Sequence, residues 1–366
     1  MNPVDALNEI AFRLEYDRAP QFKVQAFRRA SATIAVLAPD ELSARAGDGR
    51  LKATKGIGAS TFEVIRQALN GETPSRLEAL RAAATSPLTS AGERLKAKIR
   101  GDLHTHSEWS DGTTSIELMV DAARQLGREY VALTDHSPNL TVAHGLTAER
   151  LAEQLDVVKS LDGVEEPDGA KSHDDSGTSS SAGGTSAGAG AGAGLRLLTG
   201  IEVDILDDGA LDQSPELLAR LDIVVASVHS KLRSDKATMT KRMLGAVADP
   251  HTNILGHCTG RLIEGSRGTR PPSDFDAKRV FAACASNNVA VEINARPERT
   301  DPPDDLIAAA LDAGCLFSID SDAHAPGQQA LLDYGIERAA LLGVPVDRIV
   351  TTWPVERLLE WSRASR

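Results

Sequence analysis

Nine histidines occur in the chain, and six of them stand in short motifs that follow apolar, β-rich runs. Three carboxylates occupy equivalent places, in the motifs WSDG, TGIEVD and IDSDAH. Imidazole and carboxylate groups together form the ligand set that proteins use for zinc, manganese or iron. The candidate metal ligands are His104, His106, Asp111, His136, Glu202, His229, His257, Asp322 and His324.

The spacing of these motifs favours convergence on one site. Residues i and i+2 of an extended strand point to the same face, which pairs His104 with His106 and Asp322 with His324. Nine ligands exceed the four that a tetrahedral ion takes, so we expect two or three divalent ions that share carboxylates. Such ions attract phosphate, and a metal-bound hydroxide is a nucleophile for phosphoester hydrolysis at neutral pH.

Residues 163–194 are rich in Gly, Ser and Ala and contain almost no residue that could bury apolar surface. We therefore expect a disordered insertion between a helix and the third strand. The insertion carries His173, which we place outside the metal site. His144 and His251 lie in polar loops and are placed outside it as well.

The metal-ligand motifs need a scaffold that brings strand ends together, and residues 99–366 have the pattern of one. Short β-rich runs alternate with amphipathic helices such as 115–126 and 304–313, which is typical of an α/β fold with a parallel sheet. In a closed barrel, the carboxyl ends of all strands meet at one rim, where active sites are built. We expect seven strands, at 100–104, 129–134, 196–203, 222–228, 253–256, 289–293 and 316–319.

Residues 1–84 are predicted to be helical. Apolar residues recur every three or four positions over 4–14 and 24–37, and a third helical run over 60–69 stops at an Asn-Gly pair. Residues 85–98 are expected to be a linker between the helical domain and the barrel domain.

Composition excludes several classes of protein. Hydrophobic residues make up 41% and charged residues 25% of the chain, as in ordinary globular proteins. No run approaches the roughly 20 apolar residues of a membrane helix, and the first residues lack the features of a secretory signal. Only three cysteines occur, which excludes a disulfide scaffold. We expect a cytoplasmic protein without a membrane partner.

Charge is distributed unevenly along the chain. Residues 1–100 hold 16 Lys and Arg against 11 Asp and Glu, a net charge of +5, whereas the whole chain carries −12. The amino-terminal part is thus where a polyanion would bind. Ordinary surface charge is the alternative interpretation.

The series DLHTHSEWSDG, LTDHS, GIEVDI, SVHS, LGHCTGR, VEINA and SDAH resembles the polymerase-and-histidinol-phosphatase (PHP) family of metallophosphoesterases. The resemblance covers about residues 100–366, and all nine ligand positions of the family are filled. It implies a distorted (β/α)7 barrel with a trinuclear metal centre. By resemblance, His104, His106, Glu202 and Asp322 belong to the more buried pair of ions, with Asp111 and His136 nearby, and His229, His257 and His324 complete the set.

The amino-terminal region is similar to the small helical domain that opens bacterial family X DNA polymerases. The similarity lies in PQFKVQAFRRASATIAVL and KATKGIGASTFEVIRQALNGETPSRLEALR, and it implies a helix-hairpin-helix turn at GIG. Glycines in such a turn let backbone N–H groups approach a DNA phosphate at a helix N-terminus. Lys23, Arg28 and Arg29 add positive charge. The candidate DNA-binding residues are Lys52, Lys55, Gly56, Ile57 and Gly58.

Two departures from family X narrow the expected chemistry. The palm domain with its catalytic aspartates is replaced by a short linker, so we expect no nucleotide polymerisation. Val64 stands where lyase-competent members carry a Schiff-base lysine, with Ser60 one turn earlier, so lyase chemistry through that lysine is not expected.

Three basic residues near strand ends are candidate substrate contacts. Arg261 follows His257 by four residues, Arg296 lies just past the sixth strand, and Lys231 follows His229. The two arginines could bind phosphate oxygens through two nitrogens at once, and Lys231 as a point charge. Salt bridges at the rim are the alternative for all three.

Three functions remain open. The first is hydrolysis of phosphodiesters or 3′-phosphates at gapped or 3′-ended DNA, as in 3′→5′ exonucleases, 3′-phosphatases and abasic-site endonucleases of repair. The second is hydrolysis of a small phosphomonoester, as in histidinol phosphatases. The third is a non-catalytic DNA-binding module, which the complete ligand set disfavours. Salt-sensitive binding to gapped DNA would separate the first from the second.

Overall fold

A computed structural model describes residues 1–162, 194–265 and 268–364. Within these residues, seven parallel strands form one sheet in the chain order β1 to β7. Each strand matches its predicted run to within one residue at either end. The strands are β1 (Gly101–Thr105), β2 (Tyr130–Leu133), β3 (Arg196–Asp204), β4 (Ile223–Ser227), β5 (Ile254–Leu255), β6 (Ala290–Asn294) and β7 (Leu316–Asp320).

The sheet curls into a nearly closed barrel, because its two edge strands meet. A parallel bridge joins Thr105 to Ala323, and the backbone N–H of Leu103 donates to Asp320 Oδ1 at 2.9 Å. The strands are buried almost throughout, as expected where helices cover a parallel sheet. The predicted fold class, a distorted (β/α)7 barrel, is confirmed.

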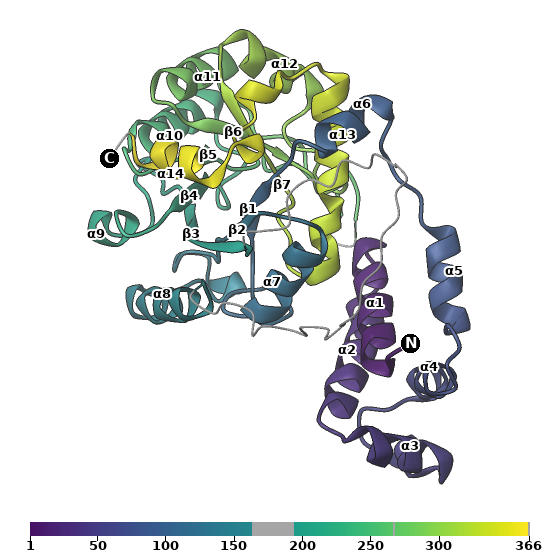
Figure 1. Cartoon of the computed structure of the whole chain (residues 1–366). Coiled ribbons are helices and arrows are strands. Elements are labelled where there is room, and N and C mark those ends of the chain that lie inside the picture. Colours follow the sequence, from purple (N-terminus) through teal and green to yellow (C-terminus); the bar gives the residue numbers. More distant parts are fainter. Residues whose placement is uncertain (163–193, 266–267, 365–366) are drawn as a thin grey trace, which may run out of the picture.

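Helices cover the outside of the barrel, as Figure 1 shows. The chain between β3 and β4 contributes only one short helix, α9. The helices are α6 (Ser90–Lys96), α7 (Ile116–Gln125), α8 (Ala148–Asp162), α9 (Pro215–Leu218), α10 (Lys236–Ala248), α11 (Ala277–Ser286), α12 (Asp304–Asp312), α13 (Leu332–Leu341) and α14 (Val355–Arg363). Helix α6 lies where we expected a linker, and its Leu95 is buried in the barrel core.

The amino-terminal region is helical and has a hydrophobic core of its own, built from residues such as Leu7, Ile10, Phe27, Leu51 and Ile65. Apolar side chains recur every three or four residues along α1 and therefore lie on one face. The helices are α1 (Pro3–Tyr16), α2 (Gln21–Ala35), α3 (Pro39–Gly47), α4 (Ala59–Leu69) and α5 (Ser75–Ala83). The division at residues 84 and 98 stays a prediction.

The turn between α1 and α2 lies against the barrel. Buried Glu15, near the end of α1, accepts a hydrogen bond from the backbone N–H of Gly327 at 2.8 Å. It also forms an ion pair with Arg28 at 2.8 Å. Arg18 pairs with Glu264 at 2.6 Å. In Figure 1, α1 is the helix of this region beside the barrel, whereas α3 and α4 lie farther away.

Two further expectations concern the insertion and membrane helices. Residues 163–193 of the expected insertion lie outside them. No helix in the described part of the chain has the length and apolar character required to cross a membrane.

Candidate metal centre

The nine predicted ligand side chains lie at the carboxyl end of the barrel, in or just after β1, β2, β3, β4, β5 and β7. They fall into four groups whose ligand atoms lie within 4.8 Å of one another, and several residues belong to two groups. The groups are His106–Asp111–His136–His324, His104–His106–Asp322, His104–Glu202–His257 and His136–Glu202–His229. The structure thus brings all nine side chains into one continuous cluster.

Glu202, near the end of β3, lies at the centre of this cluster. Its Oε1 atom is 2.8 Å from His257 Nε2 and 3.2 Å from His229 Nε2. Its Oε2 atom faces three further imidazoles, those of His104, His106 and His136, at 3.3, 3.5 and 2.9 Å. A carboxylate in this position can bridge two cations.

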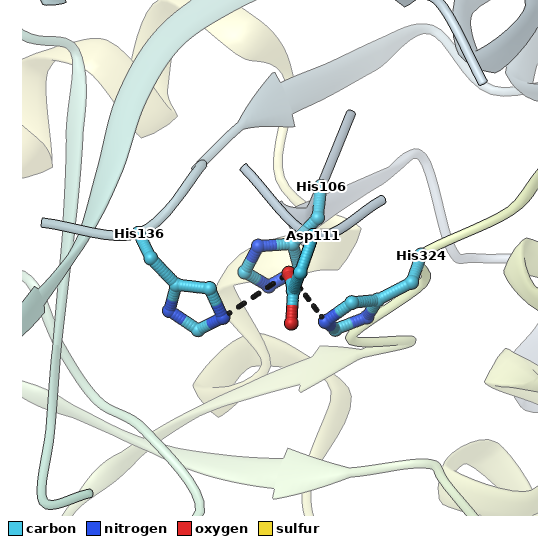
Figure 2. Close-up of side chains that lie close together, drawn as sticks. All are labelled: His106, Asp111, His136 and His324. Atoms are coloured by element: carbon cyan, nitrogen blue, oxygen red, sulfur yellow. Dashed lines mark ion pairs between the residues drawn. The ribbon is translucent and has the colours of Figure 1, made fainter. Parts of the chain in front are cut away.

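Asp111 lies between His136 and His324, as Figure 2 shows. Its Oδ1 atom lies 3.4 Å from His136 Nε2 and 3.2 Å from His324 Nε2. The side chain of Asp111 is 36% exposed, whereas His106 behind it is fully buried. Asp111 is therefore the most exposed of these four side chains.

Many polar atoms of the cluster are buried and make no hydrogen bond among the described residues. They include both carboxylate oxygens of Glu202, the Nε2 atoms of His104 and His106, and both ring nitrogens of His257. Each such atom costs about 1–3 kcal/mol of folding free energy. Coordination of divalent cations would satisfy one nitrogen of each imidazole and the oxygens of Glu202, so these residues fit a metal site of two or more ions.

Two ligands of the cluster, Glu202 and His106, are held in the deprotonated forms that metal binding requires, whereas neighbouring carboxylates, against the effect of burial, raise the pKa of His104 and His229. Burial alone would raise the pKa of Glu202, but His104, His229 and His136 hold it well below its usual value. Burial, together with His324 and His136, lowers the pKa of His106 to about 3. The carboxylate is therefore ionised and this imidazole neutral near pH 7, the forms in which both coordinate metals.

A second layer of polar residues, which the sequence analysis did not assign, orients the ligands. Nδ1 of His104 lies 2.6 Å from Oε1 of Glu292 in β6. Buried Arg299 approaches Asp322, with Nε 3.2 Å from Oδ2, and Asp204 lies 3.4 Å from Nδ1 of His229. The position of Glu292 could have been recognised from the sequence, because a charged residue inside a buried apolar strand is unusual. No comparable feature of the sequence marks Arg299.

The three candidate substrate contacts lie in different surroundings. Arg296 lines the cleft beside the cluster, with Nη1 3.2 Å from His324 Nδ1 and 2.8 Å from the carbonyl of Asp322. Arg261 turns away and donates to the carbonyls of Arg299 and Thr300. Lys231 is exposed and pairs with Asp207. Of these three candidates, only Arg296 lines the cleft.

The GIG turn lies at the start of α4. Gly56 has a φ of 97°, a left-handed conformation that favours glycine, and Gly58 caps the helix, donating from its N–H to Thr61 Oγ1 at 2.9 Å. Ile57 is buried in the helical core, whereas Lys55 is exposed and Lys52 lies 5.4 Å from the ring centroid of Phe62. Both lysines are thus close in sequence to the N-terminus of α4, and Lys52 lies over a ring of its first turn.

A cleft of about 1100 Å³ opens in front of the metal cluster. Asp111, His136, His229 and His324 line one wall. Further lining residues come from the α1–α2 turn and the first residues of α2, namely Asp17 to Gln21, Val24 and Gln25. The helical region therefore forms part of the candidate site.

Comparison with known proteins finds a matching family model and several relatives of this chain. The family model described as PHP domain matches residues 102–296. "DNA polymerase/3'-5' exonuclease PolX" of Bacillus subtilis (strain 168) is 37% identical over 227 residues, which is 62% of this chain and 34% of that protein. "Probable phosphatase YcdX" of Escherichia coli (strain K12) is 29% identical over 174 residues, 45% of this chain and 66% of that protein.

Among solved structures, histidinol phosphate phosphatase from Lactococcus lactis, in complex with zinc, L-histidinol and phosphate, matches with a TM-score of 0.42 and 17% identity. The match covers 66% of this chain and 92% of that one. The chain spans about a third of the PolX protein and just under two thirds of the YcdX phosphatase. The family model covers more than half of the chain, and the predicted resemblance is confirmed: this protein belongs to the PHP domain family, whose members are metal-dependent phosphoester hydrolases.

Proposed function

We propose that this protein hydrolyses phosphodiesters or 3′-phosphates at DNA ends, as a 3′→5′ exonuclease, a 3′-phosphatase or an abasic-site endonuclease. The observation that carries the proposal is the cleft, which is lined both by residues of the metal-ligand cluster and by the α1–α2 turn. The same helical region presents the GIG turn and its two lysines. Similarity to a protein named as a 3′-5′ exonuclease supports it.

The nine side chains would hold two or three divalent ions, of zinc, manganese or iron. Bound there, such ions supply Lewis acidity and lower the pKa of coordinated water for attack on phosphorus. Glu202 links the inner groups of ligands, and Asp111 closes the outer group next to the cleft. Arg296, held by Glu298 at 2.8 Å and by the carbonyl of Asp322, places a cation beside the substrate phosphate.

A second candidate is hydrolysis of a small phosphomonoester by the same cluster, which similarity to a protein named as a phosphatase favours. In that case the helical region would shape the cleft without binding DNA. Removal of the helical region cannot separate the two functions, because the truncation would also remove a wall of the cleft. Substrate preference of the intact chain is the sharper criterion.

The test is a panel of labelled substrates with the full-length protein: a recessed 3′ end, a 3′-phosphate, an abasic duplex and p-nitrophenyl phosphate. We expect kcat/KM to be highest on one of the DNA ends. His104→Ala and Asp322→Ala should lower turnover at least about 100-fold, while DNA affinity stays within about twofold. His251→Ala, at a histidine outside the cluster, is the matched control. Turnover of p-nitrophenyl phosphate with no activity on any DNA end would instead support the second candidate.

A further inference from the structure

The α2 segment carries an unusual concentration of positive charge. Residues 18–39 contain Arg18, Lys23, Arg28 and Arg29 and no acidic residue, in a chain with a net charge of −12. Arg28 pairs with Glu15 and Arg18 with Glu264, but Lys23 and Arg29 are exposed and make no ion pair with another described residue. These two cations are available to a polyanion.

One face of α2 joins the metal cleft to the GIG turn. Phe22, Gln25, Arg29 and Thr33 follow one another at three- and four-residue steps and therefore share that face. At its first end, Gln25 lines the cleft. At its other end, Thr33 lies against the GIG turn, where its hydroxyl would be 3.0 Å from a side chain added at Gly56. In Figure 1, α2 lies beside α1 and leads towards α3.

The start of this face exposes an aromatic ring. Phe22 is 70% exposed, one of the largest values for any large apolar side chain in the described residues. Two further exposed apolar residues flank the cleft: Val142, which lines it, and Ile263, between the lining residues Leu262 and Glu264. Exposed aromatic side chains next to cations are how proteins hold single-stranded nucleic acid, because every base can stack on a ring.

We propose that this face of α2, the α2 track of Phe22, Gln25, Arg29 and Thr33 with Lys23 beside it, binds the 3′-terminal strand of DNA and guides it from the GIG turn to the metal cleft. The inference rests on the proposed function and names the path of its substrate. Phe22 stacks on a base near the 3′ end, and Lys23 and Arg29 neutralise phosphates along the strand. The 11 residue steps from Phe22 to Thr33 rise about 16 Å along the helix axis. This length corresponds to roughly five nucleotide steps of 3.4 Å.

The experiment compares Phe22→Ala and Arg29→Gln with the wild-type chain. Two exposed barrel residues provide matched controls, Leu341→Ala for the apolar side chain and Arg279→Gln for the cation. The substrates are single-stranded 3′-phosphorylated oligonucleotides of two to ten nucleotides and p-nitrophenyl phosphate, which has neither base nor chain. We expect each track variant to lower kcat/KM on the ten-nucleotide substrate about tenfold, the size of one lost stacking interaction. Turnover of p-nitrophenyl phosphate should stay within twofold, which also shows that the variants fold.

Oligonucleotide length provides a second criterion. Wild-type kcat/KM should rise with length and level off near five nucleotides, and the rise should be weaker in both track variants. If the wild-type protein hydrolyses DNA ends but the track variants behave like the control variants, the track is refuted and the proposed function stands. If the wild-type protein hydrolyses only p-nitrophenyl phosphate, both are refuted.

Discussion

The Nδ1 atom of His104 lies 2.6 Å from Oε1 of Glu292, and both side chains are completely buried. The other oxygen of Glu292 accepts the backbone N–H of His257, so this carboxylate contacts two of the predicted metal ligands. It thereby directs Nε2 of His104 towards Glu202, 3.3 Å away. A carboxylate behind a ligating imidazole fixes the ring and increases its basicity.

Glu292→Gln should therefore weaken metal binding about 10- to 100-fold, the usual range for loss of such a partner. Competition against a fluorescent chelator measures the affinity, and kcat should fall in parallel at limiting metal. Glu356→Gln, at an exposed glutamate of α14, serves as the control. Equal metal affinity of the Glu292→Gln variant and the wild-type chain would show that this carboxylate does not orient the ligand.

Replacement of Lys52 and Lys55 by Ala should weaken DNA binding and reduce its dependence on salt. In a plot of the logarithm of the binding constant against the logarithm of the salt concentration, each phosphate contact with duplex DNA contributes about −0.9 to the slope. The slope of the double variant should therefore be less negative by about 2. Fluorescence anisotropy on a gapped duplex at several salt concentrations gives this slope. Substitution of the exposed lysines Lys159 and Lys278 should leave it unchanged. An unaltered slope in the Lys52/Lys55 variant would remove the GIG turn from the DNA interface.

Much of the architecture could be predicted from the sequence because it depends on local patterns. Apolar runs predicted the position of every strand, and the motifs at the strand ends contained all nine side chains of the cluster. The contacts of Arg261 and Lys231 could not be predicted, because each depends on which neighbour its long side chain meets after folding. The same holds for the cleft wall at the α1–α2 turn, which is fixed by Glu15 and Arg18 through partners more than 240 residues away in the chain.

Glu15→Ala should destabilise the fold by about 3 kcal/mol, because the substitution leaves Arg28, whose side chain is only 11% exposed, without its partner. The backbone N–H of Gly327 also loses its acceptor. The free energy of unfolding in urea, followed by circular dichroism, measures the loss. Glu41→Ala breaks an exposed ion pair with Arg45 and should cost less than about 1 kcal/mol. Similar values for the two variants would mean that Glu15 contributes no more than a surface charge.

The cysteines should be inert towards thiol reagents near neutral pH. All three are buried, and burial raises the pKa of Cys315 to about 11 and that of Cys284 well above its usual value. Since the thiolate is the reactive form, these thiols stay protonated and unreactive at pH 8. Ellman's reagent should detect no fast-reacting thiol in the native protein and three after unfolding in guanidinium. A rapid reaction of one thiol at pH 8 would show that a cysteine is more accessible than the structure indicates.

The central claim is that nine side chains at one end of the barrel form a multinuclear metal site, with Glu202 shared among its ions. Elemental analysis of the purified full-length protein and of the Glu202→Ala variant tests it directly. We expect two or three equivalents of zinc, manganese or iron per wild-type chain, and at most one in the variant, because its inner ligand groups lose their common carboxylate. A wild-type protein that hydrolyses phosphoesters while free of metal, or a variant that keeps the full complement of ions, would contradict it.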